Sequence, residues 1–174
     1  MVGKIFYFLS GLRFLCMYFE KKSVKEDLLM KNSLKWALRL LPLLYMAAVW
    51  IQSSLPADQF VKLPDSALDH TIKESLHLIE FAILYVLLVL AFLTRRRMFT
   101  AALNVSCALF AALYGISDEI HQSFYPYRSA SLFDLVKDFT GIAVCFYFIR
   151  RALFGGKFAK LGRVLGRVRG LGGS

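Results

Sequence analysis

Four long apolar runs constrain the fold of this chain more than any other feature of its sequence. They cover about residues 36–54, 73–93, 98–117 and 132–153. Crossing a bilayer core about 30 Å thick takes about 20 apolar residues, and each run is close to that length. Hydrophobic residues make up 57% of the 174-residue chain, more than a soluble domain of this size can bury. The sequence therefore predicts an all-α membrane protein, folded as an up-and-down bundle of four transmembrane helices.

The residues before the first run predict a separate N-terminal element. Residues 5–19 are apolar but are interrupted by Gly11 and Arg13. At 1.5 Å per residue they reach only about 22 Å, too short to span, so we expect an N-terminal interfacial helix among the lipid headgroups. No small-residue cleavage site follows, so a removable signal peptide is not expected. Residues 20–35 are charged and predict a cytoplasmic linker.

The placement of basic residues predicts the orientation in the membrane. Most of the 22 basic residues lie in the N-terminal stretch, in the link Arg95-Arg96-Arg97 or in the tail that follows run four. By the positive-inside rule these parts are cytoplasmic, and the other two links are extracytoplasmic. The tail is glycine-spaced and free of acids, which favours contact with anionic lipid. Nucleic acid is not expected as a partner, because no folded recognition module accompanies the tail.

Ionisable and amide side chains gather at only one end of each run. In an up-and-down bundle these ends meet at one membrane face, where a converging set of costly charges predicts a site. Helical spacing supports the convergence, because residues three, four and seven apart share a helix face. Glu119 points about 100° away from its neighbours and suits another partner. The groups are Ser53 and Ser54; Lys73, His77 and Glu80; Asp118, Glu119, His121 and Gln122; and Asp134 and Asp138.

Three interpretations of this cluster stay open. In acid–base chemistry, a histidine (His77 or His121) is oriented by a carboxylate, and a cation such as Lys73 or Arg128 holds a phosphate or carboxylate. Ser53 or Ser54 can supply a hydroxyl nucleophile, although serines at a helix end commonly serve as caps. In the structural interpretation, the network only fixes helix register and caps helix ends.

A divalent metal is the third interpretation. His77-x-x-Glu80 and Asp118-x-x-His121 place imidazole and carboxylate at a chelating i, i+3 spacing, which suits zinc, manganese or iron. The ammonium group of Lys73, beside the first pair, argues against a bare cation there. The cofactor is therefore left unknown. The three cysteines, Cys16, Cys107 and Cys145, are scattered and predict neither a zinc site nor a disulfide framework.

Four motifs in chain order resemble those of the VanZ-like family of bacterial membrane proteins, over about residues 36–150. They are Ser53-Ser54-Leu55-Pro56, Lys73-x-x-x-His77-x-x-Glu80-Phe81, Asp118-Glu119-Ile120-His121-Gln122 and Pro126-Tyr127-Arg128-x-x-Ser131-x-x-Asp134. Phe81 stands where the family usually has tyrosine, Tyr127 where it has glycine, and Asp138 where asparagine is frequent. The family's namesake is an accessory protein for resistance to the glycopeptide teicoplanin. The resemblance implies a location in the bacterial cytoplasmic membrane and a polar site, but no established reaction.

On these grounds we divide the chain into residues 1–35, a VanZ-like four-helix domain over 36–154, and a basic cytoplasmic tail over 155–174. We predict acid–base roles for His77, Glu80, Asp118, Glu119, His121 and Asp138, and ligand binding for Lys73, Gln122, Arg128, Ser131, Asp134, Ser53 and Ser54.

Three functions follow as hypotheses, and whether the protein is an enzyme stays open. The first is modification of a lipid headgroup or a lipid-linked cell-wall precursor at the outer face. The second is non-catalytic binding of an anionic envelope ligand. The third is a small transporter or proton pathway, for which no broken helix pair or inverted repeat is visible.

Overall fold

All the regular secondary structure in the part of the chain that the structure describes is helical. The computed structural model describes residues 2–55, 66–126 and 132–173, with side chains over 26–55, 79–126 and 132–172. No strand occurs in these ranges, so the all-α prediction is confirmed. The elements are α1 (Val2–Ser53), α2 (Ser66–Leu93), α3 (Ala101–Gln122), α4 (Leu132–Phe154), α5 (Ala159–Gly170) and a 3₁₀ turn, η2 (Leu171–Gly173).

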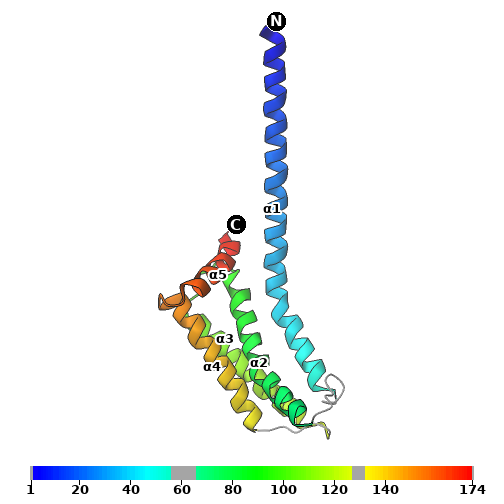
Figure 1. Cartoon of the computed structure of the whole chain (residues 1–174), viewed down its shortest axis with the longest axis vertical. Helices are drawn as coiled ribbons and strands as arrows, with labels where there is room; N and C mark the ends of the chain where they lie inside the picture. Colours follow the sequence, from blue (N-terminus) through cyan, green and yellow to red (C-terminus); the bar gives the residue numbers. More distant parts are fainter. Residues whose placement is uncertain (1, 56–65, 127–131, 174) are drawn as a thin grey trace.

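Helix α1 corrects the prediction for the N-terminal residues. A single helix of 52 residues runs from Val2 to Ser53, where we expected an interfacial helix, a charged linker and a first span. Residues 20–35 are therefore helical, and their role as a cytoplasmic linker stays a prediction. Pro42 lies inside the helix, where it removes a backbone hydrogen bond and favours a bend. Figure 1 shows α1 changing direction before its C-terminal end.

Two helical segments in the described residues are long and apolar enough to cross a membrane. They are Glu26–Ser53 of α1 and Ala101–Gln122 of α3, while Ile79–Leu93 of α2 is a shorter apolar helix. Large apolar side chains on these helices are exposed, among them Leu44 and Leu113. This pattern supports a helical membrane protein; the four-span arrangement stays a prediction.

Helix α2 forms the centre of the bundle and packs against α1, α3 and α4. Its buried face carries Phe81, Leu84, Tyr85, Val89 and Leu93, at the spacing of one helix face. Helix α3 packs against this face at Gly115, where a Cβ would make an ordinary contact of 3.5 Å with the Phe81 ring. Midway along the bundle, the buried Tyr85 hydroxyl donates to Asn104 Oδ1 at 2.8 Å.

The two ends of the bundle differ in character. At the lower end in Figure 1, α1 and α3 finish and α2 and α4 begin. At the opposite end, Arg39 of α1 donates from Nε to Thr94 Oγ1 (3.0 Å) and from Nη2 to Thr94 O (2.7 Å), which ties α1 to α2. Helix α5 packs against α2 and α4 at this second end and buries Leu165.

Candidate functional site

A serine and a histidine meet where α1 and α3 finish. Ser54 follows the last residue of α1, and its Oγ lies 2.9 Å from Nε2 of His121. The same hydroxyl lies 2.9 Å from the carbonyl oxygen of Trp50, to which it can donate. When the Ser54 proton points toward Trp50, His121 is the donor of the pair. When the hydroxyl rotates toward His121, Nε2 is the acceptor and is placed to take the proton.

Aromatic rings hold the His121 imidazole in place. The Trp50 ring stacks on it with centroids 3.9 Å apart and planes 22° apart. Tyr125 contacts it edge-on, with centroids 5.1 Å apart. Trp50 and Ser54 are one helical turn apart on α1, so both reach the same imidazole. The ring orientation is thus fixed from two sides.

A second set of contacts joins α1 and α3 beside this pair. Gln122 Nε2 donates to Asp118 Oδ2 at 2.6 Å within α3, and it reaches Ser53 Oγ at 3.5 Å across the interface. All three side chains are buried. The predicted shared face of Asp118 and Gln122 is therefore present, and both motif serines contact α3.

Helix α4 brings a buried carboxylate to the same end. Asp138 has no exposed surface, and among the described residues neither of its carboxylate oxygens has a hydrogen-bond partner. Asp118 Oδ1 is also buried and has no partner in the described part of the chain. One turn before Asp138, Asp134 forms a 3.0 Å ion pair with Lys137. A buried polar atom without a partner destabilises the folded state. A hydrogen-bond donor or a cation that met these oxygens would therefore stabilise the protein.

The two glutamates lie close to this set. Glu80 on α2 is half-buried, and its carbonyl oxygen accepts a 3.1 Å hydrogen bond from the Tyr45 hydroxyl of α1. Glu119 is buried and takes part in further interactions. We call the bundle end that carries these side chains the polar end; it comprises Ser53, Ser54, Glu80, Asp118, Glu119, His121, Gln122, Asp134 and Asp138.

Four predicted site residues cannot be placed as side chains. Lys73 and His77 belong to α2, but the structure describes only their backbone. Arg128 and Ser131 lie outside the described residues. Within the described residues no group of three or more histidine, cysteine, aspartate or glutamate side chains is arranged to hold a metal ion. The metal interpretation that needs His77 and Glu80 stays a prediction, as do the individual roles of the site residues.

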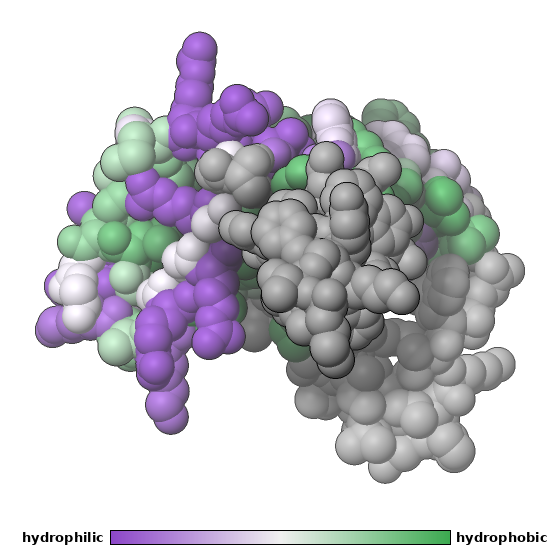
Figure 2. All heavy atoms as spheres, turned by 90° about the horizontal axis from the view of Figure 1, so that it is seen from above, coloured by the Kyte–Doolittle hydropathy of each residue, from purple (hydrophilic) through white to green (hydrophobic). Residues whose placement is uncertain are grey.

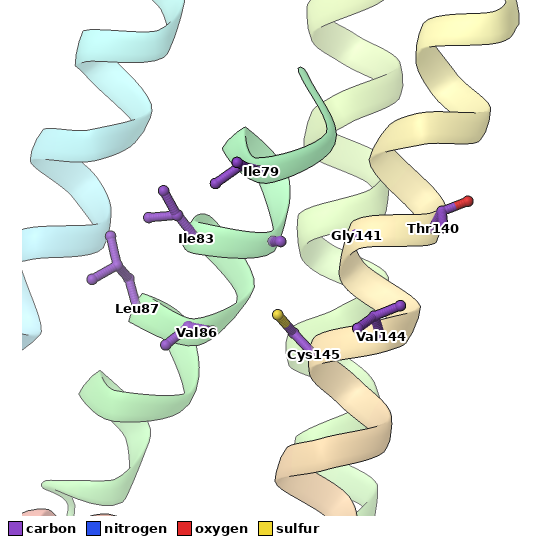
Figure 3. Close-up of a pocket in the computed structure, with 9 residues that line it drawn as sticks. Ile79, Ile83, Val86, Leu87, Thr140, Gly141, Val144 and Cys145 are labelled. Atoms are coloured by element: carbon purple, nitrogen blue, oxygen red, sulfur yellow. The ribbon is translucent and has the colours of Figure 1, made fainter. Parts of the chain in front are cut away.

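An apolar groove between α2 and α4 begins beside the polar end. Its volume is about 330 Å³, and its lining starts at Ile79, next to Glu80, and at Thr140 and Gly141, within one turn of Asp138. It runs along α2 as far as Leu87. Figure 3 shows Cys145 directed from α4 toward α2 in this groove, with Ile83 and Leu87 on α2. A polar end and an apolar groove thus adjoin on one side of the bundle.

The aromatic support of this site was not predicted from the sequence. The Trp50 ring stacks on His121. Tyr114 donates its hydroxyl to the Met46 carbonyl at 2.7 Å and so fixes α3 against α1. The spacing of Trp50 four residues before Ser54 was the available signal, because the two share a helix face.

Comparison with known proteins identifies the family. The VanZ/LLP1 family model matches residues 2–154, which extends beyond the motifs into the N-terminal half of α1. No curated protein and no solved structure matches the chain. The matched range contains all four predicted motifs and covers most of the chain, and the protein therefore belongs to the VanZ/LLP1 family.

Proposed function

We propose that this protein is a four-span protein of the bacterial cytoplasmic membrane that modifies a lipid headgroup or a lipid-linked cell-envelope precursor. In this proposal both termini are cytoplasmic and the polar end lies at the extracytoplasmic face. Glycopeptide resistance, teicoplanin included, is the physiological setting that the family name suggests. Membrane lipids and a cell-wall precursor are the proposed partners.

The hydrogen bond between Ser54 Oγ and His121 Nε2 is the observation that carries the proposal. A serine hydroxyl is a weak nucleophile unless an adjacent base takes its proton. His121 has the required distance, and the Trp50 stack limits its rotation. General-base assistance of this kind contributes typically about 10²- to 10⁴-fold in rate. The pair is therefore suited to acyl or phosphoryl transfer to Ser54, or to activation of a water molecule by His121.

The adjoining groove supports a lipid as the substrate class. From Ile79 to Leu87 it follows eight helical steps, about 12 Å at 1.5 Å per residue. One leaflet of a bilayer core is about 15 Å deep. An acyl chain in the groove would therefore run through one leaflet while its headgroup met the polar end. This match favours a lipid-linked ligand over a free soluble one.

Paired substitutions test the catalytic proposal. His121→Ala and Ser54→Ala should each reduce turnover by about 10²-fold or more, because each removes one partner of the pair. Ser123→Ala is the matched control, since that hydroxyl is exposed and donates to the Ile120 carbonyl of α3 at 2.6 Å. The measurement is mass spectrometry of envelope lipids and precursors, together with teicoplanin susceptibility, at equal membrane levels of each variant. If both site variants leave lipid profile and susceptibility unchanged, the proposal is lost.

A second candidate function is non-catalytic ligand binding. The buried, unpartnered oxygens of Asp118 and Asp138 favour it, because they are free to accept from a ligand. If the ligand is an anion, the guanidinium group of Arg128 can donate two parallel hydrogen bonds to it. Arg128→Lys should then weaken binding, because a lysine ammonium group cannot form that bidentate contact. The two functions separate in His121→Ala: a catalytic site retains ligand affinity but loses turnover, whereas a pure binding site has no turnover to lose.

A further inference from the structure

The end of the bundle opposite the polar end is strongly basic. No aspartate or glutamate occurs in residues 81–117 or 139–174, whereas residues 150–169 alone contain seven lysines and arginines. Arg95, Arg96 and Arg97, in the turn between α2 and α3, add three exposed cations at the same end. Figure 2 views the molecule from this end and shows hydrophilic side chains gathered on part of this face. We call this the basic end.

A pocket at the basic end is flanked by two arginines. Its volume is about 500 Å³, and its lining consists of Phe146, Tyr147, Arg150, Arg151, Phe154 and Gly155. Arg150 lies over the Phe146 ring at 5.9 Å, and Arg151 over the Tyr147 ring at 5.5 Å. Tyr147 and Phe154 are themselves exposed. The pocket thus presents two guanidinium groups beside aromatic surface.

The two guanidinium groups contact aromatic rings without using their N–H donors. In the described part of the chain, neither guanidinium has a hydrogen bond or an ion pair. The backbone carbonyl of Arg151, in the last turn of α4, is satisfied by other backbone groups. The amides of Gly155 and Lys157 donate to it at 3.1 Å and 3.2 Å. Gly156, with φ of +63°, makes the turn that brings these amides into place. The two side chains remain available to an anion.

The depth of the pocket matches a lipid headgroup. Arg150 follows Leu132 by 18 residues, about 27 Å along α4 at 1.5 Å per residue. A bilayer core is about 30 Å thick. If the polar end lies at one interface, the arginines lie at the other, where exposed aromatic side chains are typical. Guanidinium groups bind phosphate oxygens in a forked geometry.

We propose that the pocket at the end of α4 binds the phosphate of an anionic phospholipid in the cytoplasmic leaflet. Arg150 and Arg151 hold the phosphate, and the aromatic side chains contact the glycerol and upper acyl region. The proposal rests on the membrane topology proposed above, but not on the chemistry of the polar end.

Lipid binding to the full-length protein tests the proposal. The protein, purified in non-ionic detergent, is titrated with phosphatidylglycerol or phosphatidylcholine, and bound lipid is counted by native mass spectrometry. The wild-type chain should prefer phosphatidylglycerol. Replacing both Arg150 and Arg151 by Gln should weaken that binding at least about tenfold, because both forked guanidinium donors to the phosphate are lost.

The matched control removes the same charge elsewhere at the basic end. Arg96→Gln with Arg97→Gln should leave phosphatidylglycerol binding within about twofold, because those side chains do not line the pocket. A second measurement guards against misfolding: phosphatidylglycerol should raise the melting temperature of the wild type and of the control, but not of the pocket variant. Equal loss in both double variants would mean diffuse attraction and would overturn the site. The proposed lipid site would also be overturned if an oligonucleotide bound with the same affinity as phosphatidylglycerol and displaced it.

Discussion

At the residue scale, Asp138 is the most informative side chain. It is fully buried on α4, and within the described ranges both of its carboxylate oxygens lack hydrogen-bond partners, whereas Asp134, one turn earlier, is paired with Lys137 at 3.0 Å. The sequence places both acids in one stripe, but their surroundings are opposite. A buried polar group without partners destabilises the folded state and is retained where it serves a function.

Substitution by asparagine should separate these two acids. Asp138→Asn removes the ionisable group at an unpartnered buried position, and we expect a higher melting temperature together with lower function. Asp134→Asn breaks an ion pair and should lower the unfolding free energy by about 0.3–0.5 kcal/mol. Thermal unfolding of both variants in detergent checks the contrast in sign. A lower melting temperature for Asp138→Asn would show that this carboxylate is satisfied.

At the element scale, α5 shows how an amphipathic helix completes the bundle. Leu161, Leu165 and Val168 face α2 and α4, while Lys160 and Arg163 are exposed. Glycines allow the close approach: a Cβ at Gly162 would lie 3.1 Å from the Ala152 carbonyl, and one at Gly172 would lie 2.9 Å from the Thr94 and Arg95 carbonyls. The tail is thus a packed element of the bundle.

Loss of the buried leucine should release α5. Leu165→Ala removes an apolar side chain that is 3% exposed, and large-to-small changes in a core cost about 2–5 kcal/mol. Val164→Ala is the control, because Val164 is 54% exposed on the outer face. Limited trypsin digestion should cleave within α5 faster in Leu165→Ala than in Val164→Ala or wild type. Equal cleavage rates would show that Leu165 does not hold this helix.

At the scale of the whole molecule, the ends of the bundle have opposite charge. Acidic side chains gather at the polar end, and the segments free of acid, 81–117 and 139–174, lead to the basic end. Basic residues favour the cytoplasmic side of a membrane. The asymmetry therefore predicts how the bundle is inserted.

Cysteine labelling in whole cells tests that orientation. In a background with the three native cysteines replaced by serine, Phe124→Cys lies at the polar end and Lys157→Cys at the basic end, both at exposed positions. A membrane-impermeant maleimide should label Phe124→Cys in intact cells, and Lys157→Cys only after permeabilisation. The reverse pattern would invert the proposed topology. Labelling of both positions in intact cells would rule out the four-span arrangement.

The sequence by itself predicted the four apolar helices, because apolar run length and helical spacing are local properties, but it did not predict α5. It placed α4 within one residue of its observed bounds and predicted the shared face of Asp118 and Gln122. It did not determine that residues 2–53 form one helix, because charge and Gly11 suggested a break that helix continuity overrides.

Only the tertiary structure decided which side chains meet across helices. Ser54 faces His121, Trp50 stacks on the same ring, and Asp138 has no hydrogen-bond partner among the described residues. These outcomes depend on how α1, α3 and α4 are rotated and spaced around α2, and packing between distant segments sets that rotation. Periodicity along a single helix gives its polar face but not the residue opposite it.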